Sequence, residues 1–286
     1  MQPLISIVIP TRNSSRTLDS CLSSIQNQSY SNIELIVVDS ESFDNTLEIA
    51  KKYSAKLIKT KYKVLGARFL GLKASKGNYI LYLDSDQILV NPYIIEHSLS
   101  SFSNYDMLCL EEESYMPHSF LQKLIDADRK LVNSLSTRHL DPLEGVLIPR
   151  FYKYSLLECA FKKLAADNMH DIEISEDCLI YYHAYSISSK IGIIRKALIH
   201  KDPSSIITYF CKHYMYGKGT GLFVTSHLYQ KLIKRNIQFR KGLSFNLRSI
   251  QSIILALLRN VPFLIGVAVA RGILLWNNND TKSKGN

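Results

Sequence analysis

Tyr79-Ile80-Leu81-Tyr82-Leu83-Asp84-Ser85-Asp86 is an apolar run that leads directly into two acids separated by a serine. Five apolar or aromatic residues in a row, bounded by polar residues, are typical of a buried strand. Two carboxylates on alternate positions beyond such a strand can face different ways, one toward the top of the sheet and one toward the adjoining loop. We therefore predict a buried strand with Asp84 and Asp86 at its carboxyl end.

The chain before this run repeats a pattern of strand followed by helix. Apolar runs that predict strands end at Pro10 and at Asp39, and a shorter one covers Lys56–Lys59. The segments between them carry apolar residues at helical spacing, and the last, Val64–Ser75, is closed by Gly77. Strands joined through helices predict an α/β fold with a doubly wound, mainly parallel sheet and helices on both faces.

Polar residues stand at the ends of these predicted strands. In doubly wound sheets, ligands bind at the carboxyl ends of the strands. On this interpretation the same edge of the sheet carries Thr11, Asn13, Asp39, Asp84 and Asp86. The sequence therefore predicts a ligand site at that edge.

The pattern loosens beyond about residue 105. Helical segments such as Ser119–Leu135 mix with shorter strands and with an acidic stretch over residues 171–177. We expect this half to shape the pocket of a second substrate. No internal repeat is visible, and the low-complexity segment Asn277–Asn286 is expected to be disordered.

The composition limits the possible classes. A chain of 286 residues with 46% hydrophobic residues can bury a substantial core. Its start lacks the basic region and long apolar stretch of a secretory signal, so we expect a protein that is not exported. The five cysteines form no CxxC pair, which predicts reduced thiols and argues against a cysteine zinc site.

The formal net charge of +10 predicts attraction to polyanions, which could be nucleic acid, anionic lipid or phosphorylated substrates. Charge alone does not choose among them. The last acid before the terminal tail is Asp202, so the excess of basic residues indicates a basic C-terminal surface.

The segment over residues 246–276 is largely apolar, with interruptions at Arg259, Asn260, Pro262 and Arg271. Its longest uncharged run, Val261–Ala270, is too short to span a bilayer. We therefore expect a pair of helices in the membrane interface. The alternative is a helical hairpin packed on the catalytic core or on another subunit. The residues expected at headgroup level are Arg248, Arg259, Arg271 and Trp276.

The pair Asp84 and Asp86 has the chemistry of a metal site. Hard oxygen ligands suit Mg²⁺ or Mn²⁺ bridging two phosphates, with a phosphorylated ligand supplying further oxygens. By itself such a pair is more often a solvated turn or a helix cap, so the interpretation depends on the rest of the chain.

Several blocks, in order, resemble the family 2 glycosyltransferases of GT-A fold, which transfer sugars from nucleotide-sugar donors. The resemblance covers about residues 4–220 and departs from the family pattern at Gln87, after the two aspartates, and at Glu41 and Phe43. The matching blocks are Ile5–Asn13, Val37–Ser40 with Asp44 and Thr46, Gly66–Arg68 through Gly71 to Gly77, Asp84–Asp86, Glu176-Asp177 with Tyr181 to Lys190, and His200 with Tyr214–Gly219.

The resemblance implies a donor site. Asp84 would contact ribose or metal, Asp86 would bind the metal, and His200 would complete the metal shell or touch the diphosphate. Asp44 is expected to cap a helix. For Asp39 the alternative is a turn residue at a strand end, and for Arg68 a surface charge on a helix. The residues implied to bind the nucleotide sugar are Pro10, Thr11, Asn13, Asp39, Arg68, Asp84, Ser85 and Lys218.

The resemblance also implies that Glu176-Asp177 is the acidic pair of the active site, with Asp177 as general base on the acceptor hydroxyl. The reaction would invert the anomeric centre and would depend on Mg²⁺ or Mn²⁺. The structural alternative is that two acids at a helix start stabilise the helix dipole.

Four segments follow from these expectations. Residues 1–105 would bind the nucleotide sugar, 106–225 would form the acceptor-binding and catalytic half, 226–276 a basic amphipathic helical segment and 277–286 a disordered tail. The expected protein is cytoplasmic, associated peripherally with the inner face of the cell membrane, and acts on a glycan or lipid-linked acceptor. The alternative function is a catalytically silent nucleotide-sugar-binding scaffold at the membrane. Nucleic acid is not an expected partner, and the sequence leaves the oligomeric state open.

Overall fold

The computed structural model describes residues 2–135, 140–143, 147–164, 176–221 and 246–283. The chain divides into two compact units. The first consists of Met1–Met116 and Val132–Asp202, and the second consists of Pro117–Leu131 and Pro203–Asn286. The described strands are β1 (Ile5–Thr11), β2 (Ile33–Asp39), β3 (Lys56–Lys59), β4 (Tyr79–Tyr82), β5 (Gln87–Leu89), β6 (Met107–Ser114), β7 (Pro149–Lys153) and β8 (Ile191–His200). The described helices are α1 (Leu18–Gln26), α2 (Thr46–Lys52), α3 (Val64–Ala74), α4 (Ile94–Ser101), α5 (Phe120–Leu135), α6 (Tyr154–Leu164), α7 (Glu176–Tyr185), α8 (Ile206–Gly221) and α10 (Leu247–Ser283).

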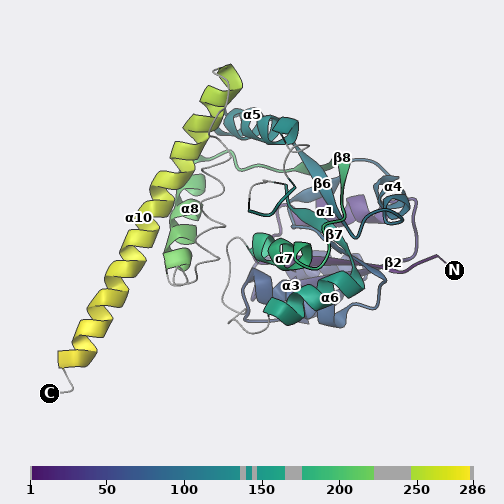
Figure 1. Ribbon diagram of the computed structural model, residues 1–286, viewed down its shortest axis with the longest axis horizontal. Coiled ribbons are helices and arrows are strands. Elements are labelled where there is room, and N and C mark those ends of the chain that lie inside the picture. Colours follow the sequence, from purple (N-terminus) through teal and green to yellow (C-terminus); the bar gives the residue numbers. More distant parts are fainter. Residues whose placement is uncertain (1, 136–139, 144–146, 165–175, 222–245, 284–286) are drawn as a thin grey trace. The chain divides into compact units, whose positions relative to one another are not determined.

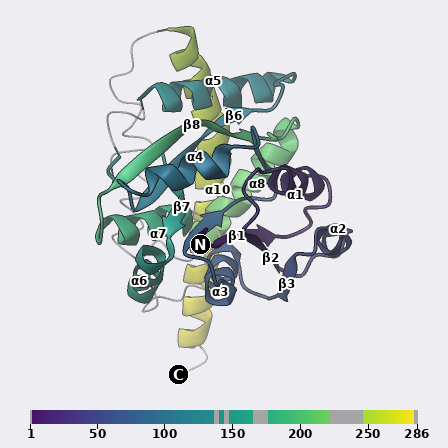
Figure 2. The same cartoon turned by 90° about the vertical axis from the view of Figure 1, so that its right-hand side faces the viewer.

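All the described strands form a single sheet in the order β3-β2-β1-β4-β7-β6-β8-β5 (Figure 1). The first four positions are parallel, and β7 enters antiparallel between β4 and β6. Figure 2 shows β3 and α2 at one edge. The expected α/β fold with a mainly parallel sheet is confirmed. The expected division at residues 105 and 106 falls between α4 and β6, inside this sheet.

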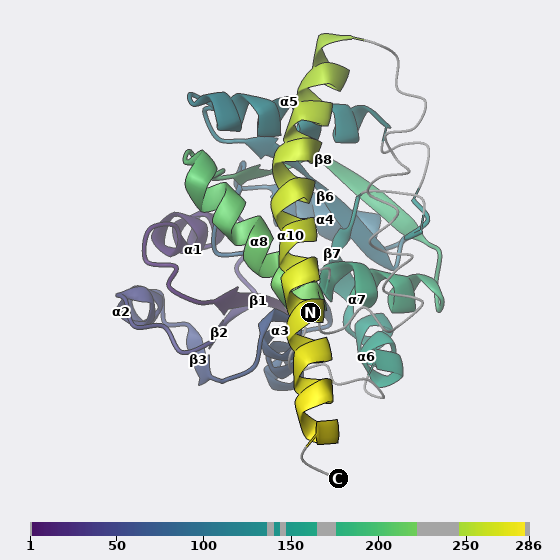
Figure 3. The same ribbon diagram turned by 90° about the vertical axis from the view of Figure 1, so that its left-hand side faces the viewer.

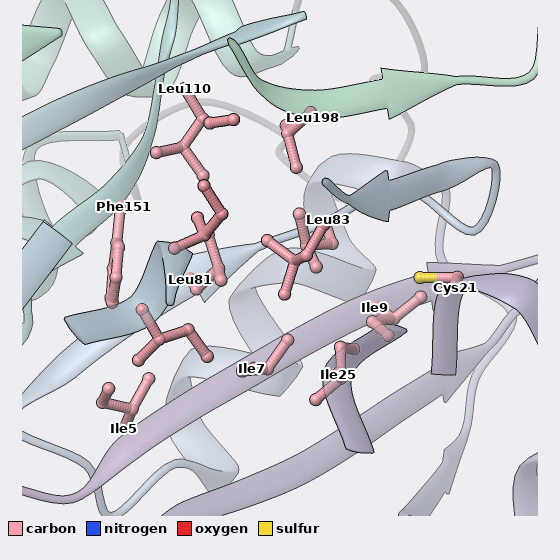
Figure 4. Packing of buried hydrophobic residues seen from close by; sticks show 14 of the residues in the cluster. Ile5, Ile7, Ile9, Cys21, Ile25, Leu81, Leu83, Leu110, Phe151 and Leu198 are labelled. Carbon is pink, nitrogen blue, oxygen red and sulfur yellow. The ribbon is translucent and has the colours of Figure 1, made fainter. Parts of the chain in front are cut away.

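Apolar side chains of β1 point alternately to the two faces of the sheet, which explains why helices cover both faces. Ile5, Ile7 and Ile9 belong to a core that includes residues of α1 and α4 (Figure 4). Val8 points to the other face, toward α3. There, a Cβ added to Gly71 would come 2.2 Å from Cγ1 of Val8. Glycine is therefore what lets α3 pack this close to the sheet.

The second unit contains α8 and α10, which lie side by side (Figure 3). A Cβ on Gly217 would lie 1.9 Å from the carbonyl oxygen of Phe263, and one on Gly266 would lie 2.1 Å from that of Tyr214. The two helices therefore touch backbone to backbone. In the same unit, Leu255 of α10 joins a small apolar cluster with Leu121, Leu124 and Tyr209.

The expectation of a pair of helices over residues 246–276 was wrong. One helix, α10, covers this range, and Pro262 lies inside it. Among the described residues, Leu247–Gly272 is one helix long and apolar enough to cross a membrane by length and composition. The length of the uncharged run was the wrong criterion for a membrane-spanning helix, because such a helix can contain a few charged residues. The helix also continues through Ser283, into the segment expected to be disordered. The side chain of Trp276 and the expected boundary at residues 225 and 226 lie outside what the structure describes.

Candidate functional site

The predicted edge of the sheet is formed by the carboxyl ends of β1, β2 and β4. Thr11 pairs with Asp39 in the parallel ladder, and the Leu83 N–H donates to the carbonyl of Val8, which carries β4 up to Asp84. Because β2 and β4 lie on opposite sides of β1, the winding of the sheet reverses here. Such a reversal leaves a crevice at the strand ends, where ligands bind.

Asp39 is buried, and hydrogen bonds occupy its carboxylate. Oδ1 accepts from Thr11 Oγ1 at 2.9 Å and from Ser42 Oγ at 2.6 Å, while Oδ2 accepts from the Ser42 N–H at 2.9 Å. The Asn13 amide oxygen accepts from the N–H of Phe43 at 3.0 Å. In this structure Asp39 therefore organises the loop after β2.

Asp44 lies in the same loop after β2, and Ser85 lies in the turn after β4. Asp44 accepts from the N–H groups of Ser15 and Thr46, although Asn45 occupies the N-cap position of α2. The Asp44 side chain thus caps the start of α2 as expected, from one residue before the N-cap position. Burial alone would raise the pKa of Asp44, but these hydrogen bonds outweigh it and lower the pKa. Ser85 Oγ donates to Ser14 Oγ at 2.9 Å, which ties the loop after β4 to the one after β1.

Asp84 lies between two guanidinium groups. Arg68 Nη2 of α3 is 2.8 Å from Asp84 Oδ1, and Arg150 Nη1 of β7 is 3.1 Å from Asp84 Oδ2. Burial alone would lower the pKa of both arginines, but the carboxylates around them, Asp84 first, raise it. Both side chains therefore remain cationic inside the protein. Among the described residues, Nε of Arg68 is buried without a hydrogen-bond partner.

Glu176 and Asp177 form the first turn of α7, and the structure brings them to the same cluster. Glu176 Oε1 is 3.4 Å from Arg68 Nη2, and Asp177 acts electrostatically on Arg68 and Arg150. Burial, followed by the charge of Asp177, raises the pKa of Glu176 to about 8. Glu176 therefore keeps its proton at neutral pH, despite its proximity to Arg68.

Asp86 lies beside His200. His200 Nε2 is 3.5 Å from Asp86 Oδ1, and His200 Nδ1 is 3.0 Å from Asp202 Oδ1. The strand pairing produces this arrangement, because Gln87 of β5 pairs with His200 of β8 and the Lys201 N–H donates to the Asp86 carbonyl. A carboxylate behind a histidine is a common way of orienting a metal-binding imidazole.

The donor set tests the expected metal. Within the part of the chain that the structure describes, no three His, Cys, Asp or Glu residues are grouped closely enough to hold an ion alone. Both oxygens of Asp84 face guanidinium groups, whereas Asp86 and His200 present one oxygen and one nitrogen side by side. These two residues fit Mg²⁺ or Mn²⁺ that takes its remaining ligands from phosphates and water.

Arg150 and Asp202 were not predicted from the sequence as site residues. Arg150 is a single charge between Pro149 and the apolar residues Phe151 and Tyr152. This pattern could have identified it, because a charge in a buried strand needs a partner. Among the predicted residues, Lys218 belongs to α8 in the second compact unit and is exposed, and Pro10 is half-buried at the end of β1.

Comparisons with known proteins show what the chain is similar to. Residues 6–104 match the family model "Glycosyl transferase family 2". WfgD of Escherichia coli, a UDP-Glc:alpha-D-GlcNAc-diphosphoundecaprenol beta-1,3-glucosyltransferase, is 31% identical over 138 residues, covering 46% of this chain and 54% of that protein. The chain therefore spans about half the length of this relative.

Solved structures share the fold. S. aureus TarS 1-349 in complex with UDP has a TM-score of 0.57 at 18% identity, over 95% of this chain and 91% of that chain. Glucosyl-3-phosphoglycerate synthase from Mycobacterium tuberculosis in complex with Mg²⁺ and UDP has a TM-score of 0.52 at 17% identity, over 80% and 79%. The fold is thus of GT-A type. The part of the chain over residues 6–104 belongs to the family 2 glycosyltransferases.

Proposed function

We propose that the chain transfers a sugar from a nucleotide-diphosphate sugar to a hydroxyl group, with inversion at the anomeric carbon. The observation that carries this proposal is the convergence of Arg68, Asp84 and the Glu176-Asp177 pair beside Asp86 at the carboxyl ends of the strands. UDP is the proposed nucleotide, because the two solved structures of similar fold hold it and WfgD is named for a UDP-sugar donor.

Asp177 is the proposed general base. Burial and the charge of Asp177 raise the pKa of its neighbour Glu176, which favours the protonated form of Glu176 over the carboxylate that a base needs. Asp177 is half-buried, and its Oδ1 accepts the Cys178 N–H at 2.8 Å, which fixes the side chain at the start of α7. It would take the proton of the acceptor hydroxyl as the oxygen attacks the anomeric carbon.

The basic groups would stabilise the departing nucleotide diphosphate. Arg68 is buried and held by Asp84, so its guanidinium is preorganised before a donor binds. Asp86 and His200 would hold Mg²⁺ or Mn²⁺, which when bound would supply positive charge to the diphosphate. Asp39, Thr11 and Asn13 shape the loop where the nucleoside is proposed to bind.

The proposed acceptor is lipid-linked, and the proposed location is the cytoplasmic face of the membrane. WfgD is named for an undecaprenol-linked acceptor. In the second unit, α10 exposes Ile253, Leu257, Val261 and Leu264, which recur every three or four residues and so share one face of the helix. Between Pro203 and Asn279 the chain has ten Lys and Arg residues and no Asp or Glu, which suits an anionic lipid surface.

Transfer assays test the catalytic proposal. UDP-sugar turnover is measured with and without EDTA for wild type, Asp86→Ala and Asp177→Asn, with the exposed residue Glu96 replaced by Gln as a control. We expect EDTA, Asp86→Ala and Asp177→Asn each to lower turnover at least about 100-fold, while the control retains it. Full activity of both site variants would contradict the mechanism. Donor binding without turnover across a panel of acceptors would favour the silent scaffold.

A further inference from the structure

Arg150 closes a ring of polar contacts around the turn that follows β4. Its Nε is 3.3 Å from Glu112 Oε1, and its Nη1 is 3.1 Å from Asp84 Oδ2. Gln87 Nε2 donates to the same Glu112 oxygen at 2.6 Å. The Asp84 N–H donates to Gln87 Oε1 at 2.8 Å. Because Asp84 also contacts Arg150, the ring is closed.

The sheet order builds this ring. Leu81 of β4 pairs with Phe151 of the antiparallel strand β7, so Arg150 lies one position farther toward the carboxyl end of β4. On the other side, Phe151 pairs with Leu108 of β6, the strand that ends in Glu112 and its neighbours. An antiparallel strand between β4 and β6 therefore delivers a guanidinium to the edge where β4 presents Asp84.

Burial makes the ring strongly coupled. Gln87 is fully buried, and the side chain of Arg150 is 13% exposed. A buried guanidinium needs the carboxylates of Asp84 and Glu112, and these acids in turn would repel each other without it. Removing one member therefore disturbs the others as well.

We propose that Arg150 is a positioning residue that, through Glu112 and Gln87, fixes the backbone of the Asp84-Ser85-Asp86 turn. This inference rests on the proposed function. The ring holds both the N–H and the carboxylate of Asp84, and the Lys201 N–H holds the carbonyl of Asp86. The turn is thus anchored at both ends, and Asp86 remains directed toward His200. Gln87, where the sequence departs from the family pattern, is the member that joins the turn to Glu112.

Amide exchange tests the positioning role without any substrate. We expect Arg150→Met to speed hydrogen exchange in peptides covering residues 83–87, and Gln87→Met to do the same. The matched control is Arg195→Met, because Arg195 forms an ion pair with Glu111, the neighbour of Glu112 on β6. Unchanged exchange at the turn in Arg150→Met, or equal acceleration there in Arg195→Met, would overturn the proposal.

Kinetics then test its consequence. We expect Arg150→Met to lower kcat about 100-fold, the effect of a small displacement of reacting groups, and Arg195→Met to leave it near wild type. Arg150→Lys keeps the charge but loses the two-point contact, so we expect it to recover only part of the rate. In a double-mutant cycle, Arg150→Met with Glu112→Leu should lose less than the product of the two single losses.

The two proposals fail in different ways. A wild-type protein that neither binds nor uses UDP-sugars contradicts the proposed function, while amide exchange still decides the role of Arg150. Normal transfer by a folded Arg150→Met variant contradicts the positioning role and leaves the proposed function standing. Independent losses in the double-mutant cycle would likewise exclude a shared ring.

Discussion

Gln87 and His200 lie opposite each other in the antiparallel pairing of β5 with β8. This pairing carries Asp86 to within 3.5 Å of the imidazole, although the two residues are far apart in the sequence. Two separate systems of charge therefore meet at the turn after β4. Asp84 contacts the buried arginines, whereas Asp86 lies beside His200, which in turn contacts Asp202.

Asp202→Asn is expected to weaken metal binding. The carboxylate lies 3.0 Å from His200 Nδ1, and loss of such a contact typically lowers metal affinity about 10-fold or more. Mn²⁺ titrations followed by electron paramagnetic resonance in the presence of UDP measure this directly. Asp19→Asn on α1 serves as the control. Equal Mn²⁺ affinity in wild type and Asp202→Asn would exclude the orienting role.

Glu176 is expected to make stability depend on pH. The folded protein raises the pKa of this acid from 4.5 to about 8, so its contribution is fully present below about pH 4.5 and is lost as the pH rises toward 8. Glu176→Gln removes that loss. As the pH rises from 5 to 8, the free energy of unfolding of the variant should increase relative to that of wild type by at least about 1.4 kcal/mol, the equivalent of one pKa unit. Denaturant unfolding at several pH values measures the difference, and a constant difference would contradict the buried acid.

Gly71→Ala is expected to destabilise the first unit by about 2 kcal/mol, because the new methyl group would overlap Val8. Gly272→Ala is the matched comparison: a Cβ there meets nothing within 4 Å, and alanine favours a helix by up to about 1 kcal/mol. Thermal unfolding should therefore shift in opposite directions. A tolerated Gly71→Ala would show that α3 can move away from the sheet.

Leu257→Gln with Leu264→Gln is expected to release the protein from vesicles. Both side chains are exposed on the apolar face of α10, and their replacement removes buried area from a lipid contact. Flotation with vesicles of phosphatidylcholine, with and without phosphatidylglycerol, measures binding. Phe43→Ser is the control, because it removes an even more exposed apolar side chain from the first unit. Undiminished binding of the double variant, or binding indifferent to anionic lipid, would contradict the proposed surface.

Local pattern was enough to predict the first half of the sheet. The strands before residue 83 are short apolar runs, and the helices between them carry apolar residues at helical spacing, so the residues at their ends could be predicted to share one edge. Thr11, Asp39 and Asp84 lie there in the structure. Their proposed contacts with a donor stay predictions.

The remainder depends on pairing between distant segments. Arg150 reaches Asp84 only because β7 inserts antiparallel beside β4, and no local signal specifies that order. The C-terminal segment was mispredicted for a different reason. Pro262 was counted among the residues that interrupt its apolar pattern, whereas α10 continues through it. The helix that Asp44 caps begins within the ordinary one-residue uncertainty of a helix boundary.

The double contact of Asp84 changes how alanine substitutions of Asp84 and Asp86 should be interpreted. Asp84→Ala would leave Arg68 and Arg150 as two like charges without the acid that separates them. Inactivity of that variant would then report a collapsed electrostatic arrangement instead of a missing metal ligand. Asp86→Ala leaves both guanidinium contacts in place. The two alanine variants therefore test different properties of the site.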